Sequence, residues 1–369
     1  MKKKRILVAM SGGVDSSLTA ALLVEQGFEV VGATMKTFCY SDNSGPSKTC
    51  CGLDGITDAQ NVSELLGIPH YVFDVEEEFT ANVIDDFVAE YSAGRTPNPC
   101  VRCNSNTKFP DLLAKGRQMG CEAIASGHYV RITHGPEQDS TLFRGTDRKK
   151  DQSYFLWDLP KTMLPFLHFP LGNLDKHTVR QKARNLNLIT ANKPESQEIC
   201  FVPTGDYRDL LERKLPTQHP SLQPGSIVTS KGEIVGNHEG FAIYTVGQRK
   251  GLGGGRGDPF YVIEIRPSTR EVVIGTEEQC FQPGVQVGNL NWLTNTPTVN
   301  SELGIQIRYR GNDVPAKVLS IGQSIALEFE KPQRAVTPGQ SAVFYSGDQV
   351  IGGGRIQSAL QRKDLSARN

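Results

Sequence analysis

Hydrophobic and polar positions follow two different patterns along the chain. In the first third, short apolar runs rich in β-branched residues occur at 5–10, 28–35 and 70–74. Between them, segments 16–26 and 55–66 carry apolar residues at helical spacing. Strands that alternate with helices in this way are typical of a parallel sheet covered by helices on both faces. We therefore predict an α/β fold class with an N-terminal doubly wound parallel sheet.

After residue 201 the pattern changes to short strands separated by glycine and proline turns. The predicted strands lie at 225–235, with a hairpin at 230–232, and at 241–246, 260–265, 305–310, 316–319, 324–329 and 341–344. Short strands at this spacing are typical of small antiparallel barrels. We expect three domains: the α/β domain over 1–205, a small central β-rich domain over 206–280 and a C-terminal antiparallel β-barrel over 281–369.

Composition limits the classes of function. The 369 residues include 40 basic and 40 acidic side chains, so no overall positive field attracts nucleic acid and any RNA contact must use local patches. No apolar stretch reaches the length of a membrane span, about 18 residues or more. The basic start at Lys2 to Arg5 precedes an apolar run that is too short for a signal peptide. We expect a soluble, cytoplasmic protein with no membrane partner.

The cysteines do not have the density of a secreted disulfide scaffold. There are eight, at Cys39, Cys50, Cys51, Cys100, Cys103, Cys121, Cys200 and Cys280. We expect Cys121 and Cys280 to be small buried hydrophobes. For the others, reduced thiols, a metal site and thiol chemistry all remain open.

The sharpest local motif is Ser-Gly-Gly-Val-Asp-Ser-Ser at 11–17, directly after a predicted strand and before a predicted helix. Gly12 and Gly13 let the backbone turn its amide groups toward an anion at the helix N-terminus. No Gly-Lys-Ser or Gly-Lys-Thr is present to hold a γ-phosphate. Asp15 is suited to hold a magnesium ion that binds the phosphates. The motif therefore predicts a nucleotide site in which γ-phosphoryl transfer is disfavoured.

A second motif presents two cysteines. Pro97 and Pro99 restrict the backbone before Cys100 and Cys103, so we predict a rigid, loop-forming segment over 97–104. A single CxxC fits a redox pair, half of a metal site or a catalytic thiol, and the absence of a second CxxC disfavours a four-cysteine zinc site. Nearby cations, Arg102 and Lys108, favour the reactive thiolate. A further cysteine, Cys200, follows a polar run much later.

Basic residues also occur on a predicted strand near the C-terminus. In 305–310, strand alternation places Arg308 and Arg310 on one face and the apolar residues with Tyr309 on the other. The basic face suits phosphates, although a solvated edge strand has the same pattern.

Eight motifs together resemble one family: SGGVDS, TPNPCVRCN, ASGHY, KKDQSYFL, SQEICFV, TVGQRKGLG, RYRG and TPGQSAVFY. Their order resembles that of the MnmA family of bacterial tRNA-specific 2-thiouridylases over nearly the whole chain. The first motif alone resembles the PP-loop of N-type ATP pyrophosphatases. The resemblance implies a PP-loop ATP pyrophosphatase and thiolase domain (adenine nucleotide alpha-hydrolase-like) before the two β domains, and tRNA contacts in the central one.

The resemblance implies a role for particular residues. It implies that Cys103 is the nucleophile and that Cys200 carries a persulfide. It implies ATP-binding positions at Ala9, Met10, Ser11, Gly12, Gly13, Val14, Asp15, Ser16, Met35 and Gly127. It implies contacts with tRNA or the target base at Asn98, Pro99, Cys100, His128, Lys150, Asp151, Gln152, Arg308, Tyr309 and Gln340. The cofactors are then ATP and Mg²⁺, and the partners are a tRNA anticodon loop and a sulfur donor such as a cysteine desulfurase or a relay protein.

The implied reaction is 2-thiolation of the wobble uridine. Adenylation of the C2 oxygen releases pyrophosphate, and AMP then leaves as sulfur from the Cys200 persulfide replaces the oxygen. Attack by Cys103 on that persulfide leaves a Cys103–Cys200 disulfide.

Three alternatives stay open at this point. Many family members have Asp where this chain has Cys100, and the third thiol allows a 4Fe-4S cluster on Cys100, Cys103 and Cys200. An amide-forming PP-loop synthetase would need the nucleotide loop but no paired cysteines. A catalytically silent tRNA-binding protein would keep the loop as a relic.

Overall fold

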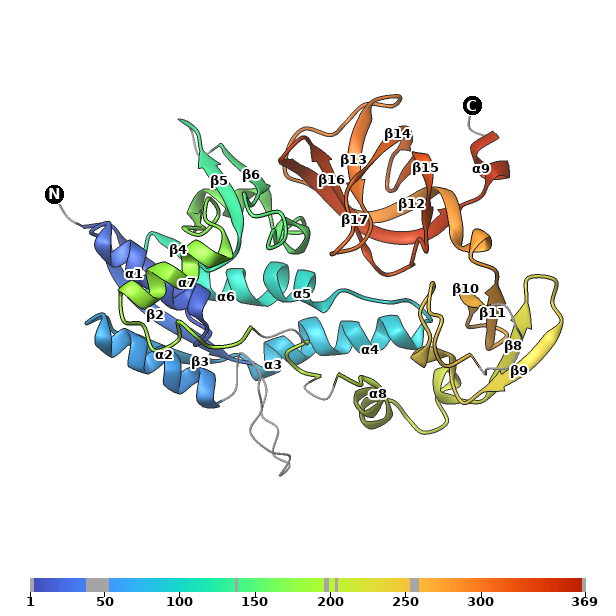
Figure 1. Ribbon diagram of the computed structural model, residues 1–369, viewed down its shortest axis with the longest axis horizontal. Helices are drawn as coiled ribbons and strands as arrows, with labels where there is room; N and C mark the ends of the chain where they lie inside the picture. Colours follow the sequence, from blue (N-terminus) through green and yellow to red (C-terminus); the bar gives the residue numbers. More distant parts are fainter. Residues whose placement is uncertain are drawn as a thin grey trace. The chain divides into compact units, whose positions relative to one another are not determined.

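The computed structural model describes residues 3–37, 53–136, 139–195, 199–202, 205–252 and 259–366. Backbone contacts divide the chain into two compact units. The first unit comprises 1–84, 100–206 and 348–350, and the second comprises 85–99, 207–347 and 351–369. Each unit therefore combines segments that are far apart in the sequence (Figure 1).

The first unit contains a five-stranded parallel sheet. Its order is β3 (His70–Asp74), β2 (Glu29–Lys36), β1 (Arg5–Ala9), β4 (Ala123–Ser126) and β7 (Leu167–His168). Strands β1 and β2 are buried along most of their length, as parallel strands covered on both faces are, whereas β3 at the edge of the sheet is largely exposed. The prediction of a parallel sheet is confirmed, and β1, β2 and β3 begin and end within one residue of the predicted runs at 5–10, 28–35 and 70–74.

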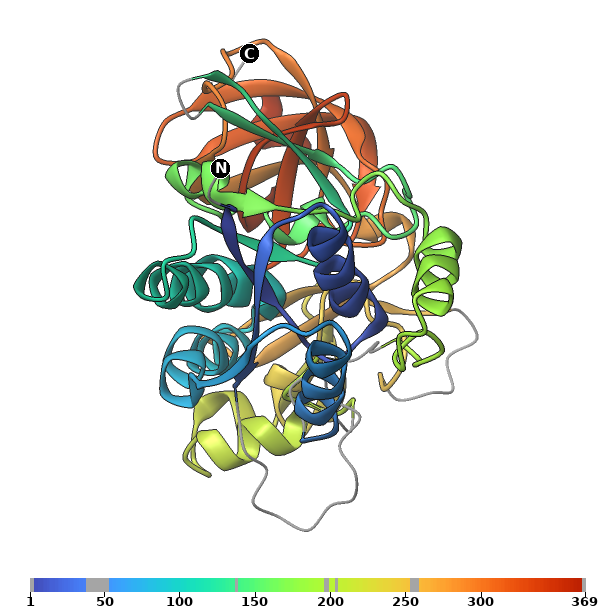
Figure 2. The same ribbon diagram turned by 90° about the vertical axis from the view of Figure 1, so that its left-hand side faces the viewer.

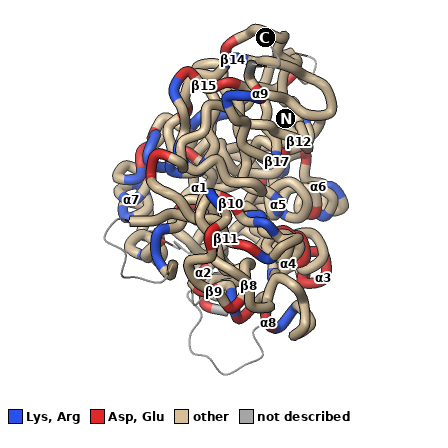
Figure 3. Tube along the Cα trace, turned by 90° about the vertical axis from the view of Figure 1, so that its right-hand side faces the viewer, with Lys and Arg blue, Asp and Glu red and all other residues tan. Residues whose placement is uncertain are grey.

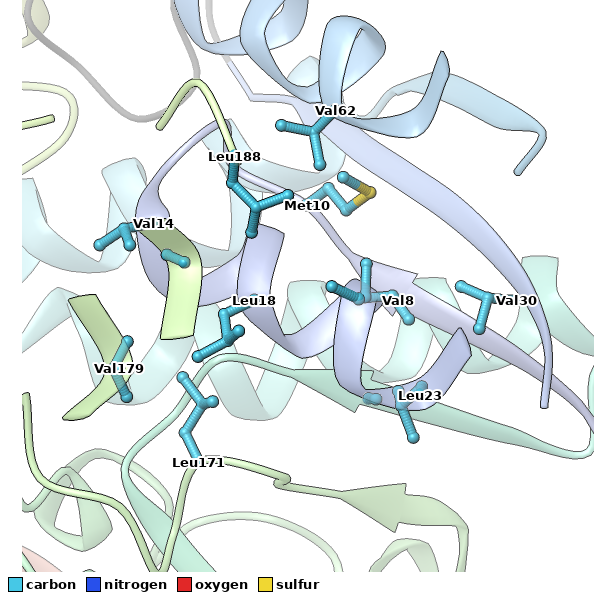
Figure 4. Packing of buried hydrophobic residues seen from close by; sticks show 14 of the residues in the cluster. Val8, Met10, Val14, Leu18, Leu23, Val30, Val62, Leu171, Val179 and Leu188 are labelled. Carbon is cyan, nitrogen blue, oxygen red and sulfur yellow. The ribbon is translucent and has the colours of Figure 1, made fainter. Parts of the chain in front are cut away.

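Helices cover both faces of this sheet (Figure 2). They are α1 (Val14–Glu25), α2 (Leu53–Leu65), α6 (Phe109–Gln118) and α7 (Lys176–Asn185). Leu18 of α1, Val62 of α2 and Val179 of α7 meet Val8 in one buried cluster on the first face (Figure 4). Leu7 points the opposite way, toward α6, where Gly116 allows close contact. The doubly wound arrangement predicted from the sequence is therefore confirmed.

Shorter elements complete the first unit. They are α3 (Glu76–Phe79), the π-helical η1 (Thr80–Ile84), α5 (Pro99–Arg102), the π-helical η2 (Cys103–Lys108), β5 (Val130–His134), β6 (Ser140–Arg144), η4 (Ser153–Phe155) and η5 (Lys161–Phe166). Strands β5 and β6 form an antiparallel hairpin, and Gln349 pairs with Phe143 at its edge.

The second unit begins with α4 (Asp85–Ser92) and later contains α8 (Arg208–Lys214) and η6 (Pro220–Leu222). Its smaller sheet has the order β10 (Tyr261–Arg266), β11 (Glu271–Gly275), β8 (Gly225–Thr229) and β9 (Ile234–His238). The predicted hairpin at 230–232 joins β8 and β9 and is confirmed. The predicted strand at 241–246 is wrong: Phe241–Ile243 form the 3-10 helix η7, and Phe241 and Tyr244 are buried in the core of this sheet. An apolar run alone does not distinguish a strand from buried helical turns.

Six strands of the second unit close into a β-barrel. Their order is β12 (Phe281–Trp292), β15 (Ile325–Arg334), β14 (Val314–Ile321), β13 (Glu302–Gln306), β16 (Ser341–Ser346) and β17 (Gln349–Leu360), and β12 also pairs with β17. Elements η8 (Glu278–Cys280) and α9 (Arg362–Ser366) flank it. Ile305, Leu327 and Phe344 lie in the barrel core. Closure leaves no unpaired strand edge, and it confirms the predicted C-terminal barrel.

Charged residues of both signs are interspersed along the trace (Figure 3), in line with the equal numbers of basic and acidic residues. Across the described ranges, no helix combines the length and apolar character that a membrane crossing requires.

Candidate active site at the glycine loop and the cysteines

The glycine motif forms the turn between β1 and α1. Gly12 has a φ of +69°, and a Cβ atom there would lie 2.1 Å from the carbonyl oxygen of Gly55, so no other residue fits without displacement. Ser16 accepts a hydrogen bond from the Ser11 amide at 3.1 Å and donates one to the Gly13 carbonyl at 3.1 Å. Local hydrogen bonds therefore fix the loop at the N-terminus of a twelve-residue helix, where an anion is favoured.

The other implied ATP positions lie at the same edge of the sheet. Met35 is near the end of β2, and Gly127 directly follows β4. A Cβ atom at Gly127 would lie 2.8 Å from the carbonyl carbon of Asp15 and 2.9 Å from the amide nitrogen of Ser16. The carboxyl ends of β1, β2 and β4 thus meet around the loop, which is where open parallel sheets bind ligands.

Asp15 lies in a charged network that sequence reasoning missed. Its carboxylate accepts hydrogen bonds from Lys176 at 2.8 Å to each oxygen and from the Tyr129 hydroxyl at 2.7 Å. Lys176 also pairs with Glu195 at 2.9 Å. Asp175 caps α7 by accepting from the Thr178 amide, so Lys176 occupies the first turn, where a cation is unfavourable. A lysine at this unfavourable position is a signal in the sequence that its side chain binds an acidic group outside the helix.

A second lysine contacts the loop itself. Lys193 donates to the carbonyl oxygen of Gly12 at 3.0 Å and pairs with Asp58 of α2. Two lysines, Lys176 of α7 and Lys193 beyond it, therefore lie at the glycine loop. These cations, the helix N-terminus and the Asp15 carboxylate fit magnesium-bound phosphates.

The structure corrects the prediction of a rigid loop over 97–104. Pro99 begins α5, and Cys103 begins the π-helical η2, which continues into α6. Proline is favoured in the first turn of a helix because its missing N–H has no partner there. Cys100 is exposed and Cys103 is partly exposed. Both thiols are therefore held by helical backbone, and π-helical segments are frequent at functional sites.

The predicted cations near these thiols have their own partners. Arg102 pairs with Asp158 at 3.8 Å, and Lys108 donates to the side chain of Asn104 at 3.0 Å. Ser105 also donates to Asp158 at 2.9 Å. The polar contacts of Arg102 and Ser105 fix the helical turn next to Cys103.

Cys200 lies in the same unit. Val202 donates to the Ile199 carbonyl at 2.9 Å, which closes a turn around Cys200. The adjacent Phe201 is buried and packs edge-on against Phe79 of α3 at 5.8 Å between ring centroids. Helix α3 also contacts η2, so the segments that carry Cys103 and Cys200 both border α3.

The five cysteines in the described ranges form no disulfide: Cys100, Cys103, Cys121, Cys200 and Cys280. Cys121 and Cys280 are buried, as predicted. Cys39, Cys50, Cys51 and the 196–198 part of the Cys200 motif lie outside the described residues. Within the described residues, no three His, Cys, Asp or Glu side chains gather into a metal-binding group.

His128 is neutral in this environment. Burial, with a smaller effect of Lys108, holds the pKa of His128 well below its ordinary value. Its Nδ1 bonds to Ser126 Oγ at 2.6 Å, and its ring packs on Phe109 and Phe169. A contact with RNA through this ring would therefore use stacking or a neutral hydrogen bond, with no positive charge.

The implied tRNA segment 150–152 is held by contacts with Gly145, Tyr129 and Glu195 of the first unit. Asp151 is 7% exposed and accepts from Arg144, the Gly145 amide and Ser153, so its carboxylate organises the loop. Gln152 accepts from the Tyr129 amide at 2.9 Å. Lys150 pairs with Glu195 at 2.6 Å. Within this segment, Lys150 carries the positive charge, and its side chain is partly exposed.

In the second unit, Gln340 holds the chain just before the cysteines. Its amide donates to the carbonyls of Thr96 at 2.9 Å and Pro97 at 3.1 Å. The Thr96 amide donates to Pro338 at 2.8 Å, and its hydroxyl bonds to Thr245 at 3.2 Å. These groups border a cavity of 340 Å³, also lined by Gln248, Arg308 and Arg334. Thr96 therefore has its amide, carbonyl and hydroxyl all bonded within this unit.

The predicted strand over 305–310 is corrected. Strand β13 ends at Gln306, whose buried amide donates to the carbonyls of Arg308 at 3.1 Å and Tyr309 at 2.8 Å. This buried polar group turns the chain, so Arg308 and Arg310 do not form one face of a strand. Arg308 donates to the carbonyls of Arg334 and Ala335, and Arg310 is exposed.

Three domain families match consecutive parts of the chain. Residues 4–204 match the tRNA methyl transferase HUP domain, 208–276 the tRNA methyl transferase PRC-barrel domain and 283–356 the aminomethyltransferase beta-barrel domain.

Relatives match almost from end to end. The tRNA-specific 2-thiouridylase MnmA of Carboxydothermus hydrogenoformans is 48% identical over 364 residues, which cover 97% of this chain and 99% of that protein. The protein of the same name from Geobacter metallireducens is 48% identical over 363 residues, with coverage of 97% and 98%. Among solved structures, NMN synthetase from Francisella tularensis covers 59% of this chain and 80% of its own at 17% identity, with a TM-score of 0.32. That likeness is too low to bear on function.

Proposed function

Because this chain belongs to the MnmA family of tRNA-specific 2-thiouridylases, we propose a mechanism that assigns its glycine loop and two of its cysteines to successive steps. The chain is an ATP-dependent tRNA sulfurtransferase. The observation that supports the mechanism best is that the nucleotide loop, Cys103 and Cys200 all belong to the first unit.

In the first step, the uridine C2 oxygen attacks the α-phosphorus of ATP and pyrophosphate leaves. The loop at Ser11 to Ser16 holds the leaving pyrophosphate with backbone amides at the N-terminus of α1. Asp15 would hold the magnesium ion that accompanies ATP, and this ion would supply positive charge against the phosphates. Adenylation is required because an amide-like oxygen is a poor leaving group, whereas AMP is a good one.

In the second step, sulfur replaces the activated oxygen. A persulfide on Cys200 supplies the sulfane sulfur. The Cys103 thiolate attacks the Cys200 sulfur, which forms the Cys103–Cys200 disulfide and releases hydrosulfide. Hydrosulfide attacks C2, AMP departs and 2-thiouridine remains. A dithiol reductant then restores both thiols, which is the state that the structure presents.

The tRNA presents its wobble uridine turned out of the anticodon loop, because a stacked base does not reach the pocket. In this proposal Lys150, Gln152 and His128 of the first unit contact the RNA, and Arg310 of the second unit offers an exposed cation. A cysteine desulfurase or sulfur relay protein loads Cys200. We expect this exchange to take place in the cytoplasm.

The alternatives have less support. The full-length relatives are thiouridylases, which disfavours an amide-forming ligase and a silent tRNA-binding protein. The 4Fe-4S version requires Cys100, Cys103 and Cys200 to converge, and these cysteines do not form a metal-binding group in the described part of the chain.

The test is nucleoside analysis of bulk tRNA by mass spectrometry. Anaerobically purified protein is incubated with tRNA, ATP, magnesium and a sulfide or persulfide source, and iron is measured in parallel. We expect new 2-thiouridine from the wild type and from Cys280→Ala, a control that changes a buried cysteine of the second unit. With persulfide as the source, Cys200→Ala should give none.

Two outcomes would contradict the mechanism. Full thiolation by Cys200→Ala under catalytic persulfide would remove the persulfide role, and iron near four atoms per chain with loss of activity on its removal would favour the cluster. AMP release without any thiolated nucleoside would favour the ligase.

A further inference from the structure

Four side chains of alternating charge connect the implied tRNA segment to the glycine loop. Lys150 pairs with Glu195 at 2.6 Å, Glu195 with Lys176 at 2.9 Å, and Lys176 with Asp15 at 2.8 Å. The side chain of Lys176 is 13% exposed and that of Glu195 is 30% exposed. All four residues belong to the first unit. The chain of contacts is continuous from one functional segment to the other.

The arrangement divides each central charge between two partners. Lys176 donates to both oxygens of Asp15 while it also pairs with Glu195. Glu195 in turn accepts from Lys150 and Lys176 through different oxygens. Burial works to raise the pKa of Glu195, but the hydrogen bonds from Lys150 and Lys176 outweigh it and lower that pKa to about 2. Glu195 is therefore an anion at neutral pH, and any change at Lys150 alters its attraction for Lys176.

A parallel route joins the same two segments. The side-chain oxygen of Gln152 accepts a hydrogen bond from the Tyr129 amide at 2.9 Å, and the backbone N–H of Gln152 donates to the Tyr129 carbonyl at 3.1 Å. The hydroxyl of Tyr129 donates to Asp15 at 2.7 Å. The backbone of segment 150–152 is thus fixed relative to Asp15, so a change in the Lys150 partner is passed to Glu195 and Lys176 without movement of the whole segment.

We infer that Glu195 and Lys176 are positioning residues that couple tRNA binding at Lys150 to magnesium-ATP binding at Asp15. This inference rests on the proposed function. A tRNA phosphate that binds Lys150 competes with Glu195 for the Lys150 ammonium group and weakens the Lys150–Glu195 ion pair. Glu195 then draws Lys176 toward itself, and the Asp15 carboxylate becomes available to magnesium. Adenylation is thereby favoured when the uridine to be activated is present.

The direction of the effect follows from the order of the charges. Magnesium and an ammonium group compete for the same carboxylate, so removal of Lys176 from Asp15 strengthens metal-nucleotide binding. Coupling free energies between sites correspond to about a 5- to 150-fold change in affinity. By linkage, magnesium-ATP strengthens tRNA binding by the same factor. A network that only stabilises the fold predicts no such factor.

The experiment is calorimetric titration with magnesium and α,β-methylene ATP, which does not react, in the presence and absence of a saturating anticodon stem-loop. In the wild type we expect the RNA to lower the dissociation constant of the analogue by about 5-fold or more. In Glu195→Gln the analogue should bind with the same affinity with and without RNA. Lys150→Met should lose the enhancement too, and the double variant should lose no more than either single one.

Asp348→Asn is the matched control. Asp348 is also an anion between two cations in the first unit, Arg131 at 2.6 Å and Arg148, and its ion pairs include none of Asp15, Lys176 and Glu195. In Asp348→Asn the RNA should lower the dissociation constant of the analogue as much as in the wild type. Thermal unfolding should show that Glu195→Gln and Asp348→Asn are both folded.

An equal enhancement in Glu195→Gln and the wild type would overturn the inference, as would a wild type without any enhancement. If the wild type thiolates tRNA while the coupling is absent, the inference alone fails. If the wild type neither binds the stem-loop nor thiolates tRNA, the proposed function fails first.

Discussion

Replacing Gly127 with alanine should displace the glycine loop with little effect elsewhere. The new methyl group would lie 2.8 Å from the carbonyl carbon of Asp15, 2.9 Å from the Ser16 nitrogen and 3.0 Å from the Asp15 Cβ. Two of these neighbours are backbone atoms of α1, which do not rotate away as the end of a long side chain does. The strand end or the loop must therefore move.

The size of the movement follows from ordinary contact distances. Non-bonded carbon atoms are in favourable contact at about 3.5–4.0 Å, so the loop must shift by about 0.5–1 Å. Overpacking of this kind costs about 1–3 kcal/mol of stability. A misplacement of about 1 Å among reacting groups costs about 100-fold in rate. We expect adenylation to fall by about two orders of magnitude while the protein stays folded.

The assay is pyrophosphate release with saturating tRNA, measured over a range of ATP concentrations, beside thermal unfolding. Gly236→Ala is the matched control, because a Cβ atom there meets only side-chain atoms of Ile227 at 3.9 Å, an ordinary contact. Wild-type kcat and KM for ATP in Gly127→Ala would show that the strand end does not constrain the glycine loop.

Other predictions concern Gln340 in the second unit, the partly buried His168 and the exposed thiol of Cys100. Gln340→Leu leaves the carbonyls of Thr96 and Pro97 without this donor, which should cost about 1–3 kcal/mol; single-turnover thiolation should slow more than tRNA affinity falls in filter binding. Burial, helped by His134 and Lys4, lowers the pKa of His168 to about 4, whereas the unfolded chain titrates near about 6.5. Between these values the unfolded state binds more protons, so stability should fall as pH drops from about 6.5 to 4, by about 1–2 kcal/mol after solvent screening. Unfolding midpoints at neutral and mildly acidic pH should differ less in His168→Gln than in the wild type. Cys100→Asp should retain thiolation and bind no iron; loss of both activity and bound iron would instead support the cluster.

The sequence alone determined the elements whose signals are local. The strand, glycine turn and helix around 5–26 were readable because the turn needs glycine and the flanking periods differ. The alternation of apolar runs also fixed the parallel sheet, and the turn spacing indicated a barrel. Burial of Cys121 and Cys280 was anticipated as well.

Local signals misled at two segments whose sequence patterns fit more than one conformation. The alternation at 305–310 fits a strand, but the buried side-chain amide of Gln306 turns the chain by donating to the carbonyls of Arg308 and Tyr309. Pro97 and Pro99 read as a loop, although Pro99 starts a helix. In each case the pattern fits two conformations, and packing selects one.

Only the tertiary structure brought the charges of the site together. Asp15 of α1 and Lys176 of α7 are 161 positions apart and meet because the two helices pack on each other. Lys176 also pairs with Glu195. A sequence motif reveals residues whose type is required by the local backbone, such as a glycine in a tight turn. A charge pair makes no such local demand, since its energy depends on distance and burial, and both are set when the sheet and its helices assemble.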